Sequence, residues 1–379
     1  MSNLGISISS FAYPLVVLEA TGSAAEAGLV GSALAGTTFV LRLPAGALVD
    51  RWDRKRILVA CDLGRALVSA SFGVALALGH FYLVQVLLVA FVEGALGVLF
   101  GPAEAAAVRR VVAPEQLRDA VAGNTSRAAF PALLGGPLGG VLFGASRALP
   151  FLADSASYLV SLGCMLSLRG PLQDGPAPAT PWLAGLFDGV RWIRAHRFLR
   201  ALLLWFTGMG VVFNSIGLVS LVLAREQGAS PRELGVMFAI VSAGGVAGAL
   251  AAPLVLRRLS RRRVVVLFAW LVLAATLLLL AAESPYAIGA LGALAFLLVP
   301  SVNALVFTII AEEAPEHLQG RALSAGIQIA SLAAPVGPVV AGALLATLGT
   351  RHTIGAYAAA LVVLAVLATL SRGLRVPEV

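Results

Sequence analysis

Charged side chains are scarce in this chain of 379 residues, at 12% of the total, whereas a soluble domain has about 25%. The hydrophobic residues, 59% of the chain, come in long runs of roughly 20 residues, which is the length that a helix needs to cross a bilayer. These runs are rich in Leu, Ala, Val and Gly and lack the alternation typical of barrel strands. The composition therefore excludes a soluble protein and predicts an all-α polytopic membrane protein.

Cysteine and the usual catalytic motifs are also lacking. The two cysteines, Cys61 and Cys164, are far apart and have no CxxC or His-paired spacing, which argues against a disulfide framework or a zinc site. The sequence contains no Gly-x-x-x-x-Gly-Lys-Ser/Thr loop for ATP, no nucleophile elbow and no zinc-hydrolase signature. We therefore expect no cofactor, no metal and no enzymatic activity.

The net charge of +8 would be compatible with nucleic-acid binding, but its distribution argues against it. The Arg residues sit in short connections between hydrophobic runs and do not form one basic face. We expect the lipid bilayer as a partner and no nucleic acid, and we expect the protein to be monomeric.

Twelve hydrophobic segments are long enough to be spanning helices. We predict them at Ser2–Leu18, Glu26–Leu48, Ile57–Leu78, Tyr82–Ala105, Val121–Ala145, Leu149–Leu168, Leu199–Leu223, Glu233–Leu256, Val264–Ala282, Tyr286–Ile310, Ala322–Leu348 and Thr353–Leu370. Most of the 27 Lys and Arg residues fall in the connections on one side. The positive-inside rule makes that side cytoplasmic and places both termini there.

The one long connection joins the two groups of six segments. Residues 169–181 are rich in Pro and Gly and are typical of a flexible linker, and residues 182–197 predict an amphipathic helix. This helix could lie on the cytoplasmic membrane surface, or it could be a simple tether. The predicted organisation is an N-terminal half at 1–168, the linker at 169–197 and a C-terminal half at 198–379.

The two halves resemble each other without gaps over two blocks. Ser23, Glu26, Gly28, Arg51, Arg54 and Arg56 match Ser230, Glu233, Gly235, Arg258, Arg261 and Arg263, and Pro114, Glu115, Gly136 and Pro137 match Pro315, Glu316, Gly337 and Pro338. A six-helix unit repeated in one orientation is therefore predicted. In this alignment Met1 matches Gly208, although the seventh segment begins near Leu199, so we expect the natural start to lie upstream.

The segment Gly46–Arg56, with the sequence GALVDRWDRKR, resembles the loop between helices 2 and 3 of the major facilitator superfamily. Its Asp-Arg-Trp-Asp-Arg form is similar to the drug:proton antiporter branch that includes macrolide efflux proteins and the enterobactin exporter. The likeness runs over nearly the whole chain. It implies the major facilitator fold, with twelve helices in two parallel six-helix repeats and a substrate site between the halves.

The resemblance also implies a cytoplasmic latch, in which carboxylates face helix dipoles and arginines. The second copy has Arg257 where the first has Asp50, which implies that the two copies form different contacts. The predicted latch residues are Gly46, Asp50, Arg51, Asp53, Arg54, Arg56, Glu312 and Glu313.

Ionisable groups within the predicted helices are the candidate site residues, because each costs about 2.5–3.5 kcal/mol to insert without a partner. Glu93 lies near the middle of the fourth segment, and desolvation there favours a neutral carboxyl that can take up and release a proton. Alternatively, Glu93 is a structural partner of Arg42 or Arg127. Glu104 follows on nearly the same face, about 16 Å further along the helix.

Asp154 in the sixth segment is the second candidate for proton coupling; alternatively, it hydrogen-bonds neighbouring helices. We expect Arg42, Arg127 and Glu104 to be structural intramembrane charges, and Asp62 and Arg65 to be partners of the cytoplasmic loop. Candidate contacts for a substrate are Phe100, Asn214 and Gln328, the last two of which could equally hold helices together.

These observations predict a secondary active transporter that works by alternating access. Export of an amphipathic small molecule, such as a drug, antibiotic or siderophore, in exchange for protons is what the resemblance implies. We expect a multi-pass protein of the bacterial inner membrane. An importer or a lipid or lysolipid flippase on the same fold, or a passive scramblase, are the alternatives.

Overall fold

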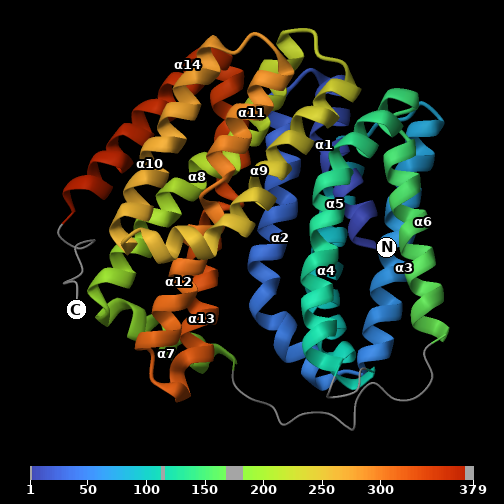
Figure 1. The fold of residues 1–379 in the computed structure, drawn as a ribbon. Helices are drawn as coiled ribbons and strands as arrows, with labels where there is room; N and C mark the ends of the chain where they lie inside the picture. Colours follow the sequence, from blue (N-terminus) through green and yellow to red (C-terminus); the bar gives the residue numbers. More distant parts are fainter. Residues whose placement is uncertain (1, 112–115, 168–181, 372–379) are drawn as a thin grey trace. The chain divides into compact units, whose positions relative to one another are not determined.

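The computed structural model describes residues 2–111, 116–167 and 182–371, and every regular element within them is a helix (Figure 1). Ten of these stretches are long and apolar enough to cross a membrane. The structure therefore confirms the all-helical membrane protein that the composition predicts. The chain divides into two compact units, Met1–Thr180 with Ser230–Ala239, and Pro181–Ala229 with Ile240–Val379. The division at 1–168 and 198–379 that follows from the repeat stays a prediction.

Within the described residues, the first unit contains six complete helices and the beginning of a seventh. Helix α3 packs against α4 and α6, α2 packs against α4, and α1 packs against α5 and α6. The bounds are Ser2–Thr21 for α1, Ala24–Arg51 for α2, Arg54–Ala77 for α3, Leu83–Val111 for α4, Leu117–Ala145 for α5, Leu149–Ser167 for α6 and Pro231–Arg258 for α9, of which the first residues belong to this unit.

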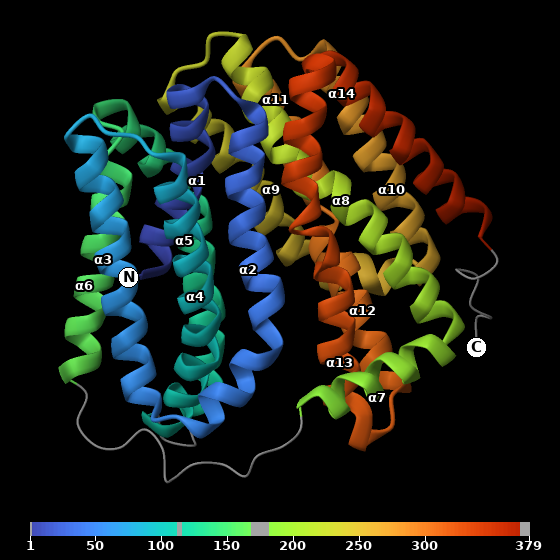
Figure 2. The same cartoon turned by 180° about the vertical axis from the view of Figure 1, so that it is seen from behind.

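In the second unit, α14 packs against α8 and α10, and Figure 2 shows α13 beside α7. The bounds are Trp182–Ala195 for α7, Arg197–Glu226 for α8, Arg261–Leu278 for α10, Pro285–Phe296 for α11, Val299–Glu313 for α12, Glu316–Ala330 for α13 and Val336–Leu370 for α14. Short 3₁₀ turns lie at Leu279–Ala281 and Ser331–Ala333. Helix α7 lies close to the range predicted for the amphipathic helix. Its Ile193 is 2% exposed and so is covered by protein.

Two of the predicted segments are not single continuous helices. Tyr286–Ile310 is divided between α11 and α12, and Ala322–Leu348 is divided between α13 and α14. The second helix of each pair begins at a proline, with Pro300 in the first turn of α12 and Pro335 at the N-cap of α14. Proline lacks an N–H and has a fixed φ, which suits it to the first turn of a helix.

The matching residues of the two halves begin a helix in both copies. The Ser23 side chain accepts a hydrogen bond from the Glu26 N–H at 3.3 Å, at the start of α2. Ser230 and Glu233 form a reciprocal capping box at the start of α9, in which the Ser230 N–H donates to the Glu233 carboxylate at 2.8 Å. Part of the internal sequence similarity therefore marks helix starts.

The glycine-rich segment Gly135–Gly140 lets α5 approach two other helices of its unit closely. A Cβ atom at Gly139 would lie 3.2 Å from the Ile8 carbonyl oxygen of α1, and one at Gly136 would lie 2.8 Å from the Gly235 carbonyl oxygen of α9. Neither position has room for a larger side chain. Small residues that allow close backbone approach are typical of helix packing in membranes.

Helix α14 is interrupted at Gly349, whose φ of 74° and ψ of 171° are not helical. Only glycine adopts such a conformation without steric cost, because it has no Cβ. Gly349 therefore joins two helical stretches that differ in direction, Val336–Leu348 and Thr350–Leu370.

We expect Gly349→Ala to lower the free energy of unfolding by about 1–2 kcal/mol, because a Cβ disfavours positive φ. No atom lies within 4 Å of the added methyl group, so backbone strain alone would be measured. The matched control is Gly355→Ala in the same helix, where φ is helical and the space is also open. Alanine should be neutral or stabilising there. Equal unfolding curves for both variants in detergent would contradict the prediction.

Candidate functional site

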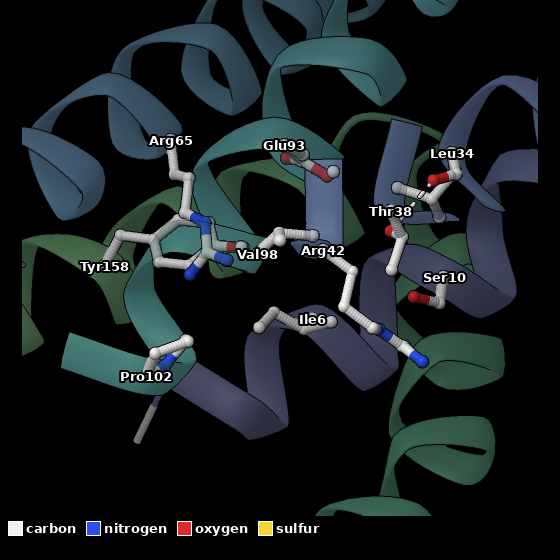
Figure 3. A pocket seen from close by; sticks show the side chains of 12 residues that line it. Ile6, Ser10, Leu34, Thr38, Arg42, Arg65, Glu93, Val98, Pro102 and Tyr158 are labelled. Atoms are coloured by element: carbon white, nitrogen blue, oxygen red, sulfur yellow. Dashed lines mark hydrogen bonds between the residues drawn. The ribbon is translucent and has the colours of Figure 1, made fainter. Parts of the chain in front are cut away.

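The first unit contains a cavity of about 440 Å³ that is lined by charged, hydroxyl and apolar side chains (Figure 3). Its walls come from α1, α2, α3, α4 and α6. The lining residues are Ile6, Ser10, Leu34, Thr38, Arg42, Arg65, Glu93, Gly94, Gly97, Val98, Pro102 and Tyr158. A cavity with apolar walls and a few charged groups is typical of a small-molecule site.

Glu93 lines this cavity from α4 and is only 8% exposed. Its Oε2 accepts a hydrogen bond of 2.8 Å from the Tyr13 hydroxyl of α1, whereas its Oε1 has no partner in the described part of the chain. The Tyr13 ring packs on Phe151, with ring centroids 5.1 Å apart, which fixes the position of the hydroxyl. Tyr13 therefore holds one carboxylate oxygen of Glu93, and the other oxygen is buried.

Asp154 lies on α6, is completely buried and does not line the cavity. It is a charged neighbour of Glu93, and the polar side chains of Ser9 and Ser157 face it. Gly5 of α1 packs directly on Asp154, since a Cβ at Gly5 would lie 3.0 Å from the Asp154 Cα. The structure therefore places both predicted proton-coupling carboxylates in the interior of one unit.

Arg65 also lines the cavity, which was not predicted from the sequence. Its side chain is 4% exposed, and its guanidinium carbon lies 5.4 Å from the Phe100 ring centre and 5.3 Å from that of Tyr158. Gly97 leaves the space that the guanidinium occupies. Stacking on two aromatic faces stabilises a desolvated cation, and Arg65 is also a charged neighbour of Glu93 and Asp154.

Asp62 and Arg65 are both buried, whereas they were predicted to be partners of the cytoplasmic loop. Their spacing in the sequence indicated a shared helix face, because Asp62, Arg65 and Ser69 follow one another at intervals of three and four residues. Such intervals place polar side chains on one helix face. Ser69 on that face donates a hydrogen bond of 3.0 Å to the Phe151 carbonyl oxygen of α6, so the face points into the unit.

The three predicted structural charges have different surroundings. Arg42 lines the cavity, and Figure 3 shows its guanidinium extending away from Glu93, on the side opposite Arg65. Glu104 is partly buried on α4 and does not line the cavity. The Arg127 side chain lies outside the described residues, so its predicted pairing stays a prediction. No ion pair of Glu93 is present among the described residues, and Tyr13 is its hydrogen-bond partner there.

The predicted substrate contacts do not line this cavity. Phe100 stacks on Arg65 and packs in an apolar cluster with Leu58 and Cys61. Asn214 and Gln328 belong to the second unit, where Asn214 donates to the Gly210 carbonyl oxygen at 2.7 Å. A second cavity in that unit, of about 280 Å³, contains neither of them and is lined by Phe206, Asn303, Val306, Phe307, Leu323, Gly326, Ile327, Ala330 and Ser331.

The first copy of the predicted latch begins a helix. Asp53 accepts a hydrogen bond of 2.8 Å from the Arg56 N–H and so caps α3, and among the described residues no atom of another element lies within 4 Å of the position of a Cβ at Gly46. Arg51 and Arg56 are exposed and Arg54 is partly buried. The Asp50 side chain lies outside the described residues.

The second copy forms an ionic cluster within the second unit. Arg261 contacts both Glu312 and Glu313, with the latter contact at 3.5 Å, and His196 also contacts Glu313. His196 was not predicted; it caps α8 by accepting a hydrogen bond of 3.2 Å from the Leu199 N–H. The structure thus brings the two predicted acids to the predicted basic segment. Whether they act as a latch stays a prediction.

The sequence pattern of the family described as transmembrane secretion effector matches residues 1–378. The multidrug efflux pump Tap of Mycolicibacterium fortuitum is 29% identical, over 98% of this chain and 93% of its own length. The multidrug efflux pump Tap of Mycobacterium tuberculosis is 27% identical, over 94% of this chain and 88% of its own.

Two kinds of solved structure have a similar fold. One is a bacterial homologue of the human lysosomal transporter Spinster in an inward-facing conformation, with a TM-score of 0.75 and 15% identity over 100% of this chain and 96% of that one. Another is the nucleoside transporter NupG, with a TM-score of 0.79 and 12% identity over 97% of this chain and 96% of that one. At these identities the likeness concerns the fold alone.

We expect Gly97→Ala to displace the Arg65 guanidinium from its two aromatic rings, because the new methyl group would occupy its place. The loss should be about 0.5–2 kcal/mol of unfolding free energy relative to Gly101→Ala. Gly101 is the matched control because it lies one turn further along α4 with no atom near its Cβ position. Both variants gain the same helix propensity, so unfolding curves that coincide would show that Arg65 does not need this space.

Proposed function

Since the chain belongs to the transmembrane secretion effector family of major facilitator transporters, we propose that it exports an amphipathic small molecule in exchange for protons, by alternating access. The names of the Tap relatives support drug-like cargo. The cavity of the first unit supports a cargo that has both apolar and polar parts, because the apolar side chains of Ile6, Leu34 and Val98 line it together with charged and hydroxyl groups.

The observation that carries the proposal is the position of Glu93. It combines two properties that a coupling carboxylate needs, burial and a place in the lining of the cavity, and its Oε1 has no hydrogen-bond partner within the described residues. Desolvation favours the neutral acid, whereas the nearby Arg65 cation favours the carboxylate. Opposing influences of this kind let small changes in solvation decide whether the proton is held.

Cargo is exchanged for protons when the two compete for the cavity, so that only one of them is bound at a time. With the cavity open to the outside, Glu93 takes up a proton and its charge is neutralised. With the cavity open to the cytoplasm, the proton leaves and the carboxylate is available to polar or positive parts of the cargo. Each ligand can shift the equilibrium between the two states only through its different affinity for them.

The proposed architecture is twelve spanning helices in two parallel six-helix repeats. The break at Gly349 supports the number of twelve helices, because this break separates two helical stretches within the long apolar segment Leu318–Leu370. The paired helix starts at Ser23 and Ser230 support the repeat. We further propose that the Gly46–Arg56 loop and the cluster of Arg261, Glu312 and Glu313 stabilise a closed cytoplasmic side.

We place the protein in the bacterial inner membrane as a monomer, with Asp154 as the second coupling carboxylate. Both Tap relatives are bacterial proteins, which supports the location. The basic connections between the helices support cytoplasmic termini.

Glu93→Gln should abolish proton-coupled transport and leave the fold intact. Glutamine conserves the volume and can still accept the Tyr13 hydrogen bond, but it cannot release a proton. The measurement is proton flux in proteoliposomes during addition of fluorescent amphipathic dyes, with a melting curve of the same variant. Glu283→Gln, an exposed acid between two helices of the second unit, is the matched control and should couple normally.

The opposite pattern would contradict this role. If Glu93 is a structural partner of Arg42 or Arg127, Glu93→Gln should lower the melting temperature, and Arg42→Gln or Arg127→Gln should restore it. Wild-type coupling in Glu93→Gln would transfer the coupling role to Asp154. Transport that ignores the proton gradient in the wild type would indicate a passive scramblase.

Both termini and the connection at residues 169–197 should face the cytoplasm, as the distribution of Lys and Arg requires. A fluorescent protein fused to the C-terminus should therefore be bright, and an alkaline phosphatase fusion at the same place should be inactive. A dark fluorescent fusion together with an active phosphatase would reverse the topology.

A further inference from the structure

A third buried carboxylate, Asp62, lies on α3 outside the cavity. The residue is fully buried, and neither carboxylate oxygen has a hydrogen-bond partner in the described part of the chain. An ionised carboxylate buried in this way is strongly unfavourable unless a charge or a proton compensates it. The coupling role proposed for Glu93 does not explain the presence of Asp62.

Asp62 belongs to a set of polar residues that three packed helices direct toward one interior. On each helix the residues are three, four or seven positions apart, or eleven in the case of Glu93 and Glu104, which keeps them on one face. We call this set the polar column; it comprises Asp62, Arg65 and Ser69 of α3, Glu93 and Glu104 of α4, and Asp154, Tyr158 and Ser161 of α6.

The order of the column follows from the contacts between these helices. Glu93 has Asp154 and Arg65 as charged neighbours, and Gly97, one turn further along α4, lies against the Arg65 guanidinium. Asp62 lies one turn beyond Arg65 on α3 and faces Ser161 of α6.

Glu104 in turn has Asp62 and Arg65 as charged neighbours. The acids therefore continue from Glu93 past Arg65 to Asp62 and Glu104, toward the end of α4 that carries Arg110.

We propose that Asp62 is a second proton-binding site, which receives the proton released by Glu93 and passes it to Glu104. This inference rests on the proposed proton coupling. In the transfer the Glu93 acid loses its proton and becomes a carboxylate, while the Asp62 carboxylate becomes the acid. Arg65 stays a cation throughout, so the net charge of the polar column does not change.

The groups that face Asp62 fit such an exchange. On its own helix these are Arg65 and Cys61; from α4 comes Glu104, and from α6 comes Tyr158. Among the described residues, the Arg65 cation is a neighbour of both acids, Asp62 and Glu104. Since Asp62 does not line the cavity, the proton would leave by a route that the cargo does not share.

Infrared spectroscopy of the reconstituted protein tests the proposal without any cargo. A neutral carboxylic acid has a carbonyl stretching band that disappears as it ionises, so the wild type should lose such bands as the pH is raised. Asp62→Asn should lack one of these bands, and Glu93→Gln should lack another. Loss of a band in Glu93→Gln alone would overturn the role of Asp62 and leave the role of Glu93 in place.

Spectra of Asp62→Asn that equal the wild type at every pH would identify Asp62 as a fixed counter-ion of Arg65 and overturn the proposal. If Asp62→Asn does not fold, Ser161→Ala decides, because it changes the polar neighbour of Asp62 and should shift the frequency of its band. An unshifted set of bands in Ser161→Ala would then be the contradicting result. Coupling measured in Asp62→Asn should fall, while the Glu93 band persists.

Discussion

The interior of the first unit depends on the burial of one cation, Arg65, among carboxylates. The cost of placing a guanidinium in an apolar membrane interior is met by two aromatic faces and by nearby negative charge. Much of the local packing serves this arrangement: Gly97 makes room for the cation, and Tyr13 holds Glu93. Arg65 is a charged neighbour of Glu93, Asp154, Asp62 and Glu104 alike.

Composition and run length were sufficient to predict an all-helical membrane protein, because a bilayer imposes strict limits on length and polarity. The family was predicted chiefly from the loop at residues 46–56, within a likeness that runs over nearly the whole chain, and the comparisons confirm the family. Helix continuity was less predictable. Pro300 and Pro335 start new helices, but apolar run length alone carries no information about such local breaks.

Within the site, the acids were easier to find than their surroundings. Glu93 and Asp154 stand out in apolar runs, and the structure places both in one interior, although their coupling role stays a prediction. Arg65 was misplaced because it lies close in sequence to a basic loop. Tyr13 and Tyr158 could not be recognised, since an aromatic residue in a spanning helix gives no sign of which neighbour its hydroxyl will meet.

The cavity acid, its tyrosine donor and the stacked arginine all belong to one compact unit. The distances among them are therefore set by helix packing inside that unit, and a rigid displacement of the unit leaves them unchanged. What can change is the hydration of the cavity, and with it the local dielectric constant. The protonation state of such a site would change when water enters or leaves the cavity, while its charged groups stay at fixed distances from one another.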